Sequence, residues 1–246
     1  MQKVEDKDIL IQNSGYCPIC ERQSRFESTH VWLRDFYVCK TCGSCPRQRA
    51  LAMVLQQLQP NWRKLLVHEG SPCIQYFSTH CKKYSSSYYF PNVPNGSIDT
   101  SSGKRCENFE DLTYPDNTFD VFMHQDVLEH VFHPEKVMKE AMRVLKPGGL
   151  HIFTAPKNKN ILISEPRAKL ENGVVRHIKP EQFHGDPKDS NGVLVTWDYG
   201  TDFDDLLIAF GGYLINTYVI RDRRYGIDGE YIEVFFSWKL PVNKVA

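Results

Sequence analysis

The stretch Tyr114-Pro-Asp-Asn-Thr-Phe-Asp-Val-Phe-Met-His-Gln-Asp-Val-Leu-Glu-His-Val131, which runs on to Arg143-Val-Leu-Lys-Pro-Gly-Gly149, determines the fold that we expect for this chain. Residues 119–123 form an apolar run with one acid inside it, which is typical of a strand buried on both faces of a parallel sheet. Polar residues 124–126 follow where this strand is expected to end. Because ligands bind beyond the carboxyl ends of strands in open α/β sheets, this end is a candidate binding site.

A helix and another strand follow in the same stretch. Pro134 is a good residue for the first turn of a helix. The apolar residues after it recur at helical spacing, namely Val137, Ala141, Val144 and Leu145. Pro147-Gly148-Gly149 ends the helix, and residues 150–155 return as a strand. This alternation of strand and helix predicts an α/β fold with a parallel sheet.

Three pieces of this stretch together resemble one protein family. Pro115-Asp-Asn-Thr-Phe-Asp120, Val127-Leu-Glu-His130 and the segment from Arg143 to Gly149 resemble, in order and spacing, the class I S-adenosylmethionine-dependent methyltransferases, in their broad type 11-like branch. The alternative is an unrelated βαβ unit that shares a Pro-Gly-Gly stop. The resemblance implies a Rossmann-like sheet of seven strands with the last strand antiparallel, and an enzyme that takes its methyl group from S-adenosylmethionine.

Length and charge limit the classes of protein to consider. The chain has 246 residues, enough for one sizeable domain and a small second one. Its 30 basic and 30 acidic residues give no net charge and hence no overall attraction to nucleic acid or acidic membranes. No apolar run approaches the roughly 20 residues of a membrane helix, and residues 1–8 are too charged for a signal peptide. We therefore expect a cytoplasmic protein with reduced thiols.

Two Cys-x-x-Cys pairs near the start of the chain predict a zinc site on Cys17, Cys20, Cys39 and Cys42. Eighteen residues separate the pairs, a spacing that matches four-cysteine zinc sites. Bound metal would supply much of the folding free energy of so small a segment. Four unrelated buried thiols are the alternative. Cys45 is a second candidate for the fourth ligand, although the geometry of a knuckle favours Cys42.

The sequence predicts a small first domain and a larger second one. Residues 1–60 hold the cysteines and an amphipathic helix at 46–58, which Pro60 follows. Residues 61–246 form the expected methyltransferase domain, with an insertion at about 157–200 that is rich in Pro, Gly, Asn and His. We expect this insertion to lack regular structure and to cap the acceptor pocket. The last expected elements are a helix at 204–210 and strands at 213–220 and 230–238.

The resemblance places the cofactor at the ends of the first strands. Residues 64–68 are the expected first strand, followed by Glu69-Gly70-Ser71-Pro72, where the family has an acid and several glycines. Such a loop lets the backbone approach the methionine part of the cofactor. Residues 84–90 are the second strand, and the family's adenine-binding turn corresponds to residues 106–112. The expected cofactor-binding residues are Glu69, Gly70, Ser71, Tyr88, Asn108, Phe109 and Gln125.

A narrower set of bacterial methyltransferases resembles the chain nearly from end to end. They share the leading Cys-x-x-Cys pairs, the loop His68-Glu-Gly-Ser-Pro72 and the segment His184-Gly-Asp-Pro187. Many of them lie in glycan and small-metabolite pathways. The resemblance therefore implies a sugar or another small hydroxylated metabolite as the methyl acceptor, with methylation at oxygen.

Three residues are candidates for chemistry on the acceptor: His184, Asp126 and His130. Imidazole titrates near neutral pH, so His184 can take a proton from a hydroxyl. Asp126 and His130 would orient the acceptor or His184. The competing interpretation makes His130 a structural residue that is hydrogen-bonded to the backbone.

Two other functions stay open. An RNA methyltransferase could grip RNA with its zinc segment, but residues 17–49 carry only six basic residues against three acids, so binding of nucleic acid is not expected. The second open function is a non-catalytic binding protein on a methyltransferase fold. It is considered because Gly70 is the single glycine in a loop where the family has several. The sequence does not set the acceptor or the oligomeric state.

Overall fold

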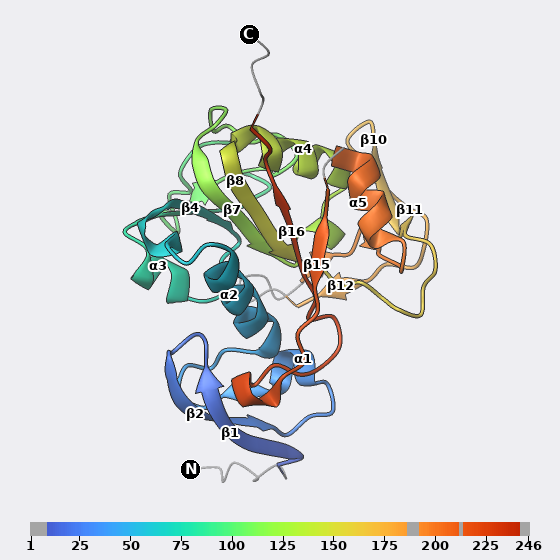
Figure 1. Ribbon diagram of the computed structural model, residues 1–246. Helices are drawn as coiled ribbons and strands as arrows, with labels where there is room; N and C mark the ends of the chain where they lie inside the picture. The colour runs from blue at the N-terminus through green and yellow to red at the C-terminus, as the bar shows by residue number, and fades with distance from the viewer. Residues whose placement is uncertain (1–8, 186–191, 212–213, 242–246) are drawn as a thin grey trace. The chain divides into compact units, whose positions relative to one another are not determined.

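The computed structural model describes residues 9–185, 192–211 and 214–241 (Figure 1). The chain divides into two compact units. Unit 1 comprises Met1–Pro60 and Tyr218–Val234, and unit 2 comprises Asn61–Thr217 and Phe235–Ala246. The segment Tyr218–Val234 thus belongs to the unit that holds the cysteines, whereas the sequence grouped it with the methyltransferase region.

Unit 2 is built on a seven-stranded sheet in the order β15-β16-β8-β7-β4-β5-β6. Its strands are β4 (Leu66–Gly70), β5 (Lys83–Tyr88), β6 (Arg105–Cys106), β7 (Phe119–Gln125), β8 (Leu145–Thr154), β15 (Asn216–Tyr218) and β16 (Val234–Trp238). Strands β4 to β8 pair in parallel, and β16 runs antiparallel to β8. The predicted Rossmann-like sheet with an antiparallel last strand is confirmed.

The order of the strands reverses at the centre of this sheet. The chain steps outward from β4 to β5 and β6, and then returns to place β7 on the other side of β4. In open α/β sheets such a switch point leaves a crevice beyond the strand ends, where ligands bind. The carboxyl ends of β4 and β7 are therefore the first place to look for a site.

The helices of unit 2 follow from sequence signals. They are η1 (Trp62–Lys64), α3 (Tyr76–His80), η2 (Leu128–His130), α4 (Pro134–Val144) and α5 (Phe203–Gly211). Helix α4 begins at Pro134, as predicted, and its apolar residues are buried in one cluster with side chains of β7, β8 and α5. No helix in the described ranges is both long enough and apolar enough to cross a membrane.

The insertion at 157–200 contains more regular structure than its composition indicates. Three short antiparallel pairs form: β9 (Glu165–Pro166) with β14 (Trp197–Asp198), β10 (Ala168–Glu171) with β11 (Val174–His177), and β12 (Phe183–His184) with β13 (Val193–Leu194). The expectation of an irregular insertion was wrong because pairs this short need no long apolar run. Asp186 and Pro187 of the expected turn lie outside the described residues, as do Gly212, Tyr213 and the tail 242–246.

The described residues of unit 1, from 9 onward, hold a three-stranded antiparallel sheet, two helices and a 3-10 turn. Its elements are β1 (Ile11–Cys17), β2 (Arg22–Ser28), α1 (Leu33–Phe36), β3 (Val38–Cys39), α2 (Pro46–Leu58) and η3 (Arg223–Tyr225). Helix α2 has the predicted bounds, with Cys45 at its N-cap and Pro46 in its first turn. Leu51, Val54 and Leu55 of its apolar stripe are fully buried.

Candidate functional site

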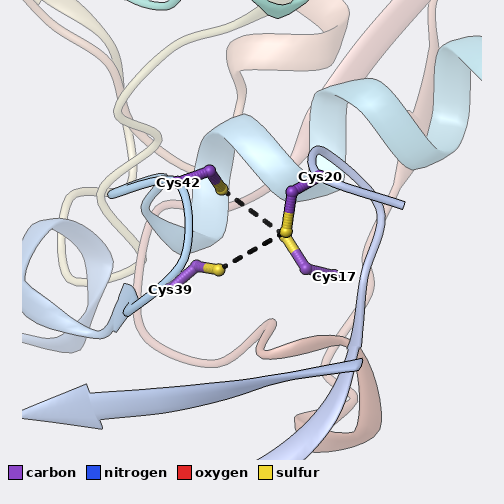
Figure 2. Close-up of side chains that lie close together, drawn as sticks. All are labelled: Cys17, Cys20, Cys39 and Cys42. Carbon is purple, nitrogen blue, oxygen red and sulfur yellow. Dashed lines mark hydrogen bonds between the residues drawn. The ribbon is translucent and has the colours of Figure 1, made fainter. Parts of the chain in front are cut away.

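The four cysteines of the two pairs converge on one point (Figure 2). Cys17 Sγ lies 3.8 Å from Cys42 Sγ, and Cys20 Sγ lies 3.8 Å from Cys39 Sγ. A tetrahedron with zinc–sulfur bonds of about 2.3 Å has edges of about 3.8 Å. The spacing of the sulfurs therefore fits a single tetrahedral zinc ion. Cys45 caps helix α2 and is not part of this group.

Two equivalent turns present the sulfurs. The backbone N–H of Glu21 donates to the carbonyl of Cys17 at 2.9 Å, and the N–H of Gly43 donates to the carbonyl of Cys39 at 2.8 Å. Glu21 and Gly43 each follow the second cysteine of a pair and each adopt a positive φ, 53° and 72°. The repeated Cys-x-x-Cys spacing thus folds into repeated knuckles, which is the local reason that four thiols face one another.

A buried arginine lies beside the cysteines. The side chain of Arg49 is 0% exposed, and its guanidinium donates to the carbonyl oxygens of Tyr37 at 2.6 Å and Gly226 at 2.5 Å. No carboxylate in the described part of the chain pairs with it. Burial lowers the pKa of Arg49, whereas the nearby cysteines raise it. A zinc ion with four thiolates carries a net negative charge, which would balance this buried cation.

Glu69 and Gln125 meet at the switch point of the sheet. Glu69 is 0% exposed, and its carboxyl accepts hydrogen bonds from Tyr84 Oη at 2.7 Å and Gln125 Nε2 at 3.4 Å. Burial raises the pKa of Glu69 to about 8, and the bonds from Tyr84 and Gln125 lower it. Gln125 Oε1 is buried and has no hydrogen-bond partner among the described residues. A ligand with a donor group, such as an amine or a hydroxyl, fits this acceptor.

The two strand ends are also strained. Ser71 follows β4 with a φ of 49°, and Asp126 follows β7 with a φ of 52°. Residues other than glycine adopt such values at a cost of roughly 1–3 kcal/mol, and they gather at functional sites. Thr154, the last residue of β8, holds Asp126 by donating from Oγ1 to Asp126 Oδ1 at 3.0 Å. The strain therefore lies at the expected cofactor-binding edge of the sheet.

A pocket of about 250 Å³ opens beside this edge, between the loop after β4 and strand β5. Its lining includes Pro72, Gln75, Tyr84 and Tyr88. The hydroxyl of Tyr88 donates to the carbonyl of Pro72 at 3.3 Å, and that of Tyr84 reaches buried Glu69. The Tyr84 side chain thus connects the pocket with buried Glu69, which also accepts from Gln125.

Asn108 and Phe109 lie in a turn that packs on the end of β4. The ring of Phe109 covers Gly70, because a Cβ added to Gly70 would lie 1.8 Å from Phe109 Cζ. Phe109 is only 7% exposed and belongs to the core cluster. The side-chain oxygen of Asn108 accepts from the N–H of Glu110 at 2.9 Å and so shapes its own turn. Contact of either residue with adenine stays a prediction.

The side chains of His184 and His130 both lie close to the carboxylate of Glu129. His130 Nε2 lies 3.9 Å and His184 Nδ1 lies 4.0 Å from Glu129 Oε1. The two imidazole rings are 5.1 Å apart between centroids and nearly perpendicular. The third residue expected beside them, Asp126, is not part of this group and is bonded to Thr154 instead.

The sequence did not single out Tyr84 or Glu129. Tyr84 carries a signal that could have found it, since Tyr84, Ser86 and Tyr88 alternate along β5 and so share one face of the sheet. Glu129 stands next to His130 inside the quoted stretch, but a lone acid in a helical turn is usually solvated. Its burial, 1% exposed, is visible only in the fold.

Comparison with known proteins gives matches for the centre of the chain. Residues 82–153 match a methyltransferase domain family. The chain is similar to the glycine/sarcosine/dimethylglycine N-methyltransferase of Actinopolyspora halophila, with 51% identity over 49 residues, 20% of this chain and 9% of the relative. It is also similar to the ubiquinone biosynthesis O-methyltransferase of Parvibaculum lavamentivorans, with 39% identity over 57 residues, 23% and 22% of the two chains. The matched stretches thus span less than a quarter of these curated relatives.

A solved structure extends the likeness to most of the fold. A methyltransferase from Haloferax volcanii, in complex with the Trm112 methyltransferase activator, superposes with a TM-score of 0.50 and 11% identity. The superposition covers 79% of this chain and 90% of that chain. The sheet order, the matched family and this likeness agree with one another. Residues 82–153 therefore match a methyltransferase domain, and the sheet around them has the fold of the class I S-adenosylmethionine-dependent methyltransferases.

Proposed function

We propose that the protein transfers a methyl group from S-adenosylmethionine to an oxygen of a sugar or another small hydroxylated metabolite. The observation that carries this proposal is the edge of the sheet at the switch point, where buried Glu69, the open acceptor on Gln125 and a pocket of about 250 Å³ occur together. The relatives named above include both an N- and an O-methyltransferase. The choice of oxygen therefore rests on this chain's own residues.

The residues that would hold the methyl donor are those at the strand ends. Glu69 and Gln125 offer a carboxyl and an amide oxygen to the amine and hydroxyl groups of the donor, and Tyr84 keeps Glu69 in place. Gly70, Ser71, Tyr88, Asn108 and Phe109 would complete the site. S-Adenosylmethionine supplies a methyl group on a positively charged sulfur, which leaves readily, so alignment provides most of the rate.

The choice of oxygen as the atom methylated follows from the group of Glu129, His130 and His184. Transfer to a hydroxyl must dispose of a proton, and this group contains two imidazoles that can handle one at neutral pH. The side chain of His184 is 39% exposed, so an acceptor can reach it, whereas Glu129 is 1% exposed. An amine that is already neutral attacks with its own lone pair, so methylation at nitrogen needs a base only to remove the proton of the ammonium form.

The zinc on Cys17, Cys20, Cys39 and Cys42 has a structural role in this proposal. All four ligands are sulfurs, which leaves no open position for a substrate. Ser24 Oγ and Ser44 Oγ lie 3.0 Å from Cys39 Sγ and 3.1 Å from Cys42 Sγ, where they can donate to thiolates. Such outer hydrogen bonds tune and orient metal ligands.

Binding of the donor is the first test. Titration calorimetry with S-adenosylmethionine and with S-adenosylhomocysteine should give one site per chain, and Gln125→Ala should weaken it. No heat with either ligand would favour the non-catalytic binding protein instead.

Methyl transfer is then followed with radiolabelled donor on sugars, phenols and bulk RNA. Label in a sugar or phenol supports the proposal, and label in RNA alone would replace it with the RNA methyltransferase. Once an acceptor is known, His184→Ala should lower turnover by roughly 10²-fold or more, with unchanged donor affinity. Turnover within a few fold of the parent, with the same pH profile, would remove His184 from the chemistry.

A further inference from the structure

Glu129, His130 and His184 come from two distant parts of unit 2, the turn η2 and the strand β12. Their ligand atoms all lie within 4.8 Å of one another. We propose that these three residues bind one divalent transition-metal ion, at a site separate from the cysteine cluster. Two imidazole nitrogens and one carboxylate oxygen, with open positions, form a donor set that suits Zn²⁺, Mn²⁺, Fe²⁺ or Co²⁺.

A backbone hydrogen bond fixes which ring nitrogen of His130 is protonated. Its Nδ1 lies 2.8 Å from the carbonyl oxygen of Leu194, which can only accept, so Nδ1 carries the proton. In the neutral ring Nε2 then presents its lone pair, and it faces Glu129 Oε1 at 3.9 Å. Metal-binding histidines are commonly fixed in this way, with the other ring nitrogen donating to a backbone carbonyl.

The distances between the two imidazoles and the carboxylate of Glu129 suit ligands of one ion. Distances of 3.9 Å and 4.0 Å from the two imidazoles to the same carboxylate oxygen are longer than hydrogen bonds. Two ligand atoms that bind one ion at about 2.1 Å each lie up to about 4.2 Å apart. Each imidazole nitrogen is therefore spaced from the carboxylate oxygen as a neighbouring ligand around one ion would be, and all three ligand atoms lie within 4.8 Å of one another.

The carboxylate of Glu129 is buried on a turn whose backbone is held in place. Glu129 is 1% exposed, and a buried carboxylate is costly unless a cation lies near it. The backbone of its turn is held in place, because Thr196 N donates to the carbonyl of Glu129 at 2.7 Å and Tyr199 Oη donates to that of Leu128 at 2.8 Å. His184, which is partly exposed, leaves one side of the site open to an outside ligand.

The metal site itself does not depend on methyl transfer, but its catalytic use rests on the proposed function. With an ion bound, His130 and His184 would serve as ligands and the ion would replace them in activating the acceptor: a hydroxyl bound to it would have a lowered pKa and would release its proton to solvent. Its oxygen then forms the new bond to the methyl carbon as the carbon–sulfur bond of the donor breaks. The products are a methyl ether, S-adenosylhomocysteine and one proton.

Titration of the intact protein with Zn²⁺ tests the site. The protein is first loaded with zinc at the cysteines and freed of excess metal, so that calorimetry reports only further binding. We expect one additional equivalent per chain. Glu129→Gln and His184→Ala should each weaken this binding by more than the roughly 10- to 100-fold that loss of an outer hydrogen bond costs.

His177→Ala is the matched control, because His177 lies in the same insertion and pairs with Glu181 outside the group. It should bind the additional zinc as the parent does, and circular dichroism should show that all three variants are folded. The proposal is overturned if the parent takes up no zinc beyond the cysteine site, or if Glu129→Gln and His184→Ala bind it like the parent. Zinc binding without transfer to any acceptor would sink the proposed function and support the metal site.

Discussion

At Glu69 the fold buries a carboxyl completely and surrounds it with two neutral hydrogen-bond donors, Tyr84 and Gln125. Burial penalises the charged form and raises the pKa to about 8, from an ordinary value of 4.5. The carboxyl is therefore mostly protonated at neutral pH in the ligand-free protein. A positively charged methyl donor that binds beside Glu69 would stabilise the ionised carboxylate. Binding of the methyl donor should therefore be coupled to release of a proton from Glu69.

The pKa of Glu69 leads to a prediction about stability. Between pH 4.5 and about 8 the folded protein keeps a proton on Glu69 that the unfolded chain has lost, so this group makes the free energy of unfolding fall as the pH rises. Glu69→Gln removes the titration. Urea unfolding of both proteins at about pH 5.5 and pH 8.5 should show the variant gaining stability relative to the parent at the higher pH. A difference between them that is the same at both pH values would contradict the buried, protonated carboxyl.

Gly70 gives a prediction about packing. A Cβ at this position would meet the ring of Phe109 at 1.8 Å, and this ring is held in the core. Gly70→Ala should therefore destabilise the protein by about 1–3 kcal/mol and weaken binding of S-adenosylhomocysteine. In a double-mutant cycle Phe109→Ala should relieve the clash, so the two changes should cost less together than the sum of their single effects. Additive costs would show that the two residues do not press on each other.

These residues also show which contacts of the candidate site could be predicted from the sequence. The meeting of Glu69 and Gln125 could be predicted because the ends of parallel strands lie at one edge of a sheet, whereas their contact with a cofactor stays a prediction. The contact of Phe109 with Gly70 joins residues far apart in the chain, and no periodicity records it. The same holds for Glu129, whose partner His184 arrives from the insertion.

Among the elements, those with strong end signals were predicted well. Helices α2 and α4 each have a proline in the first turn, and both begin at that proline. The pairs of the insertion were missed because strands of two to four residues show neither alternation nor an apolar run. What fixes them is pairing with a partner strand, which a single sequence does not reveal.

The knuckles lead to a prediction about metal and stability. Cys39→Ser removes one of four converging sulfurs, so the variant should lose most of its tightly held zinc and unfold at a lower temperature. Cys45→Ser changes a helix cap outside the group and should keep one zinc per chain. Metal analysis and thermal unfolding of both variants, made without added zinc, provide the measurement. Equal zinc in the two variants, or none in the parent, would refute the site.

For the molecule as a whole, the division into units differs from a division by sequence position. Unit 1 joins the first 60 residues with the late segment Tyr218–Val234. Arg49 donates to the carbonyl of Gly226, Asn13 Nδ2 donates to that of Arg223 at 2.7 Å, and the ring of Phe26 lies against Gly226. A shift in composition can mark the boundary between domains that are each continuous in sequence. It does not reveal that a late segment of the chain returns to the first domain.

The last prediction follows from this discontinuous unit. Removal of residues 1–60 should leave the late segment without the partners that bury Ile227 and Ile232, which are 0% and 1% exposed. Trypsin can cut this segment after Arg221, Arg223 and Arg224, so limited digestion followed by mass spectrometry reports its order. In the shortened protein we expect cleavage there much faster than in the intact one, because local unfolding exposes the backbone. Equal rates of cleavage, with an unchanged unfolding temperature, would instead show that residues 61–246 fold as an independent domain.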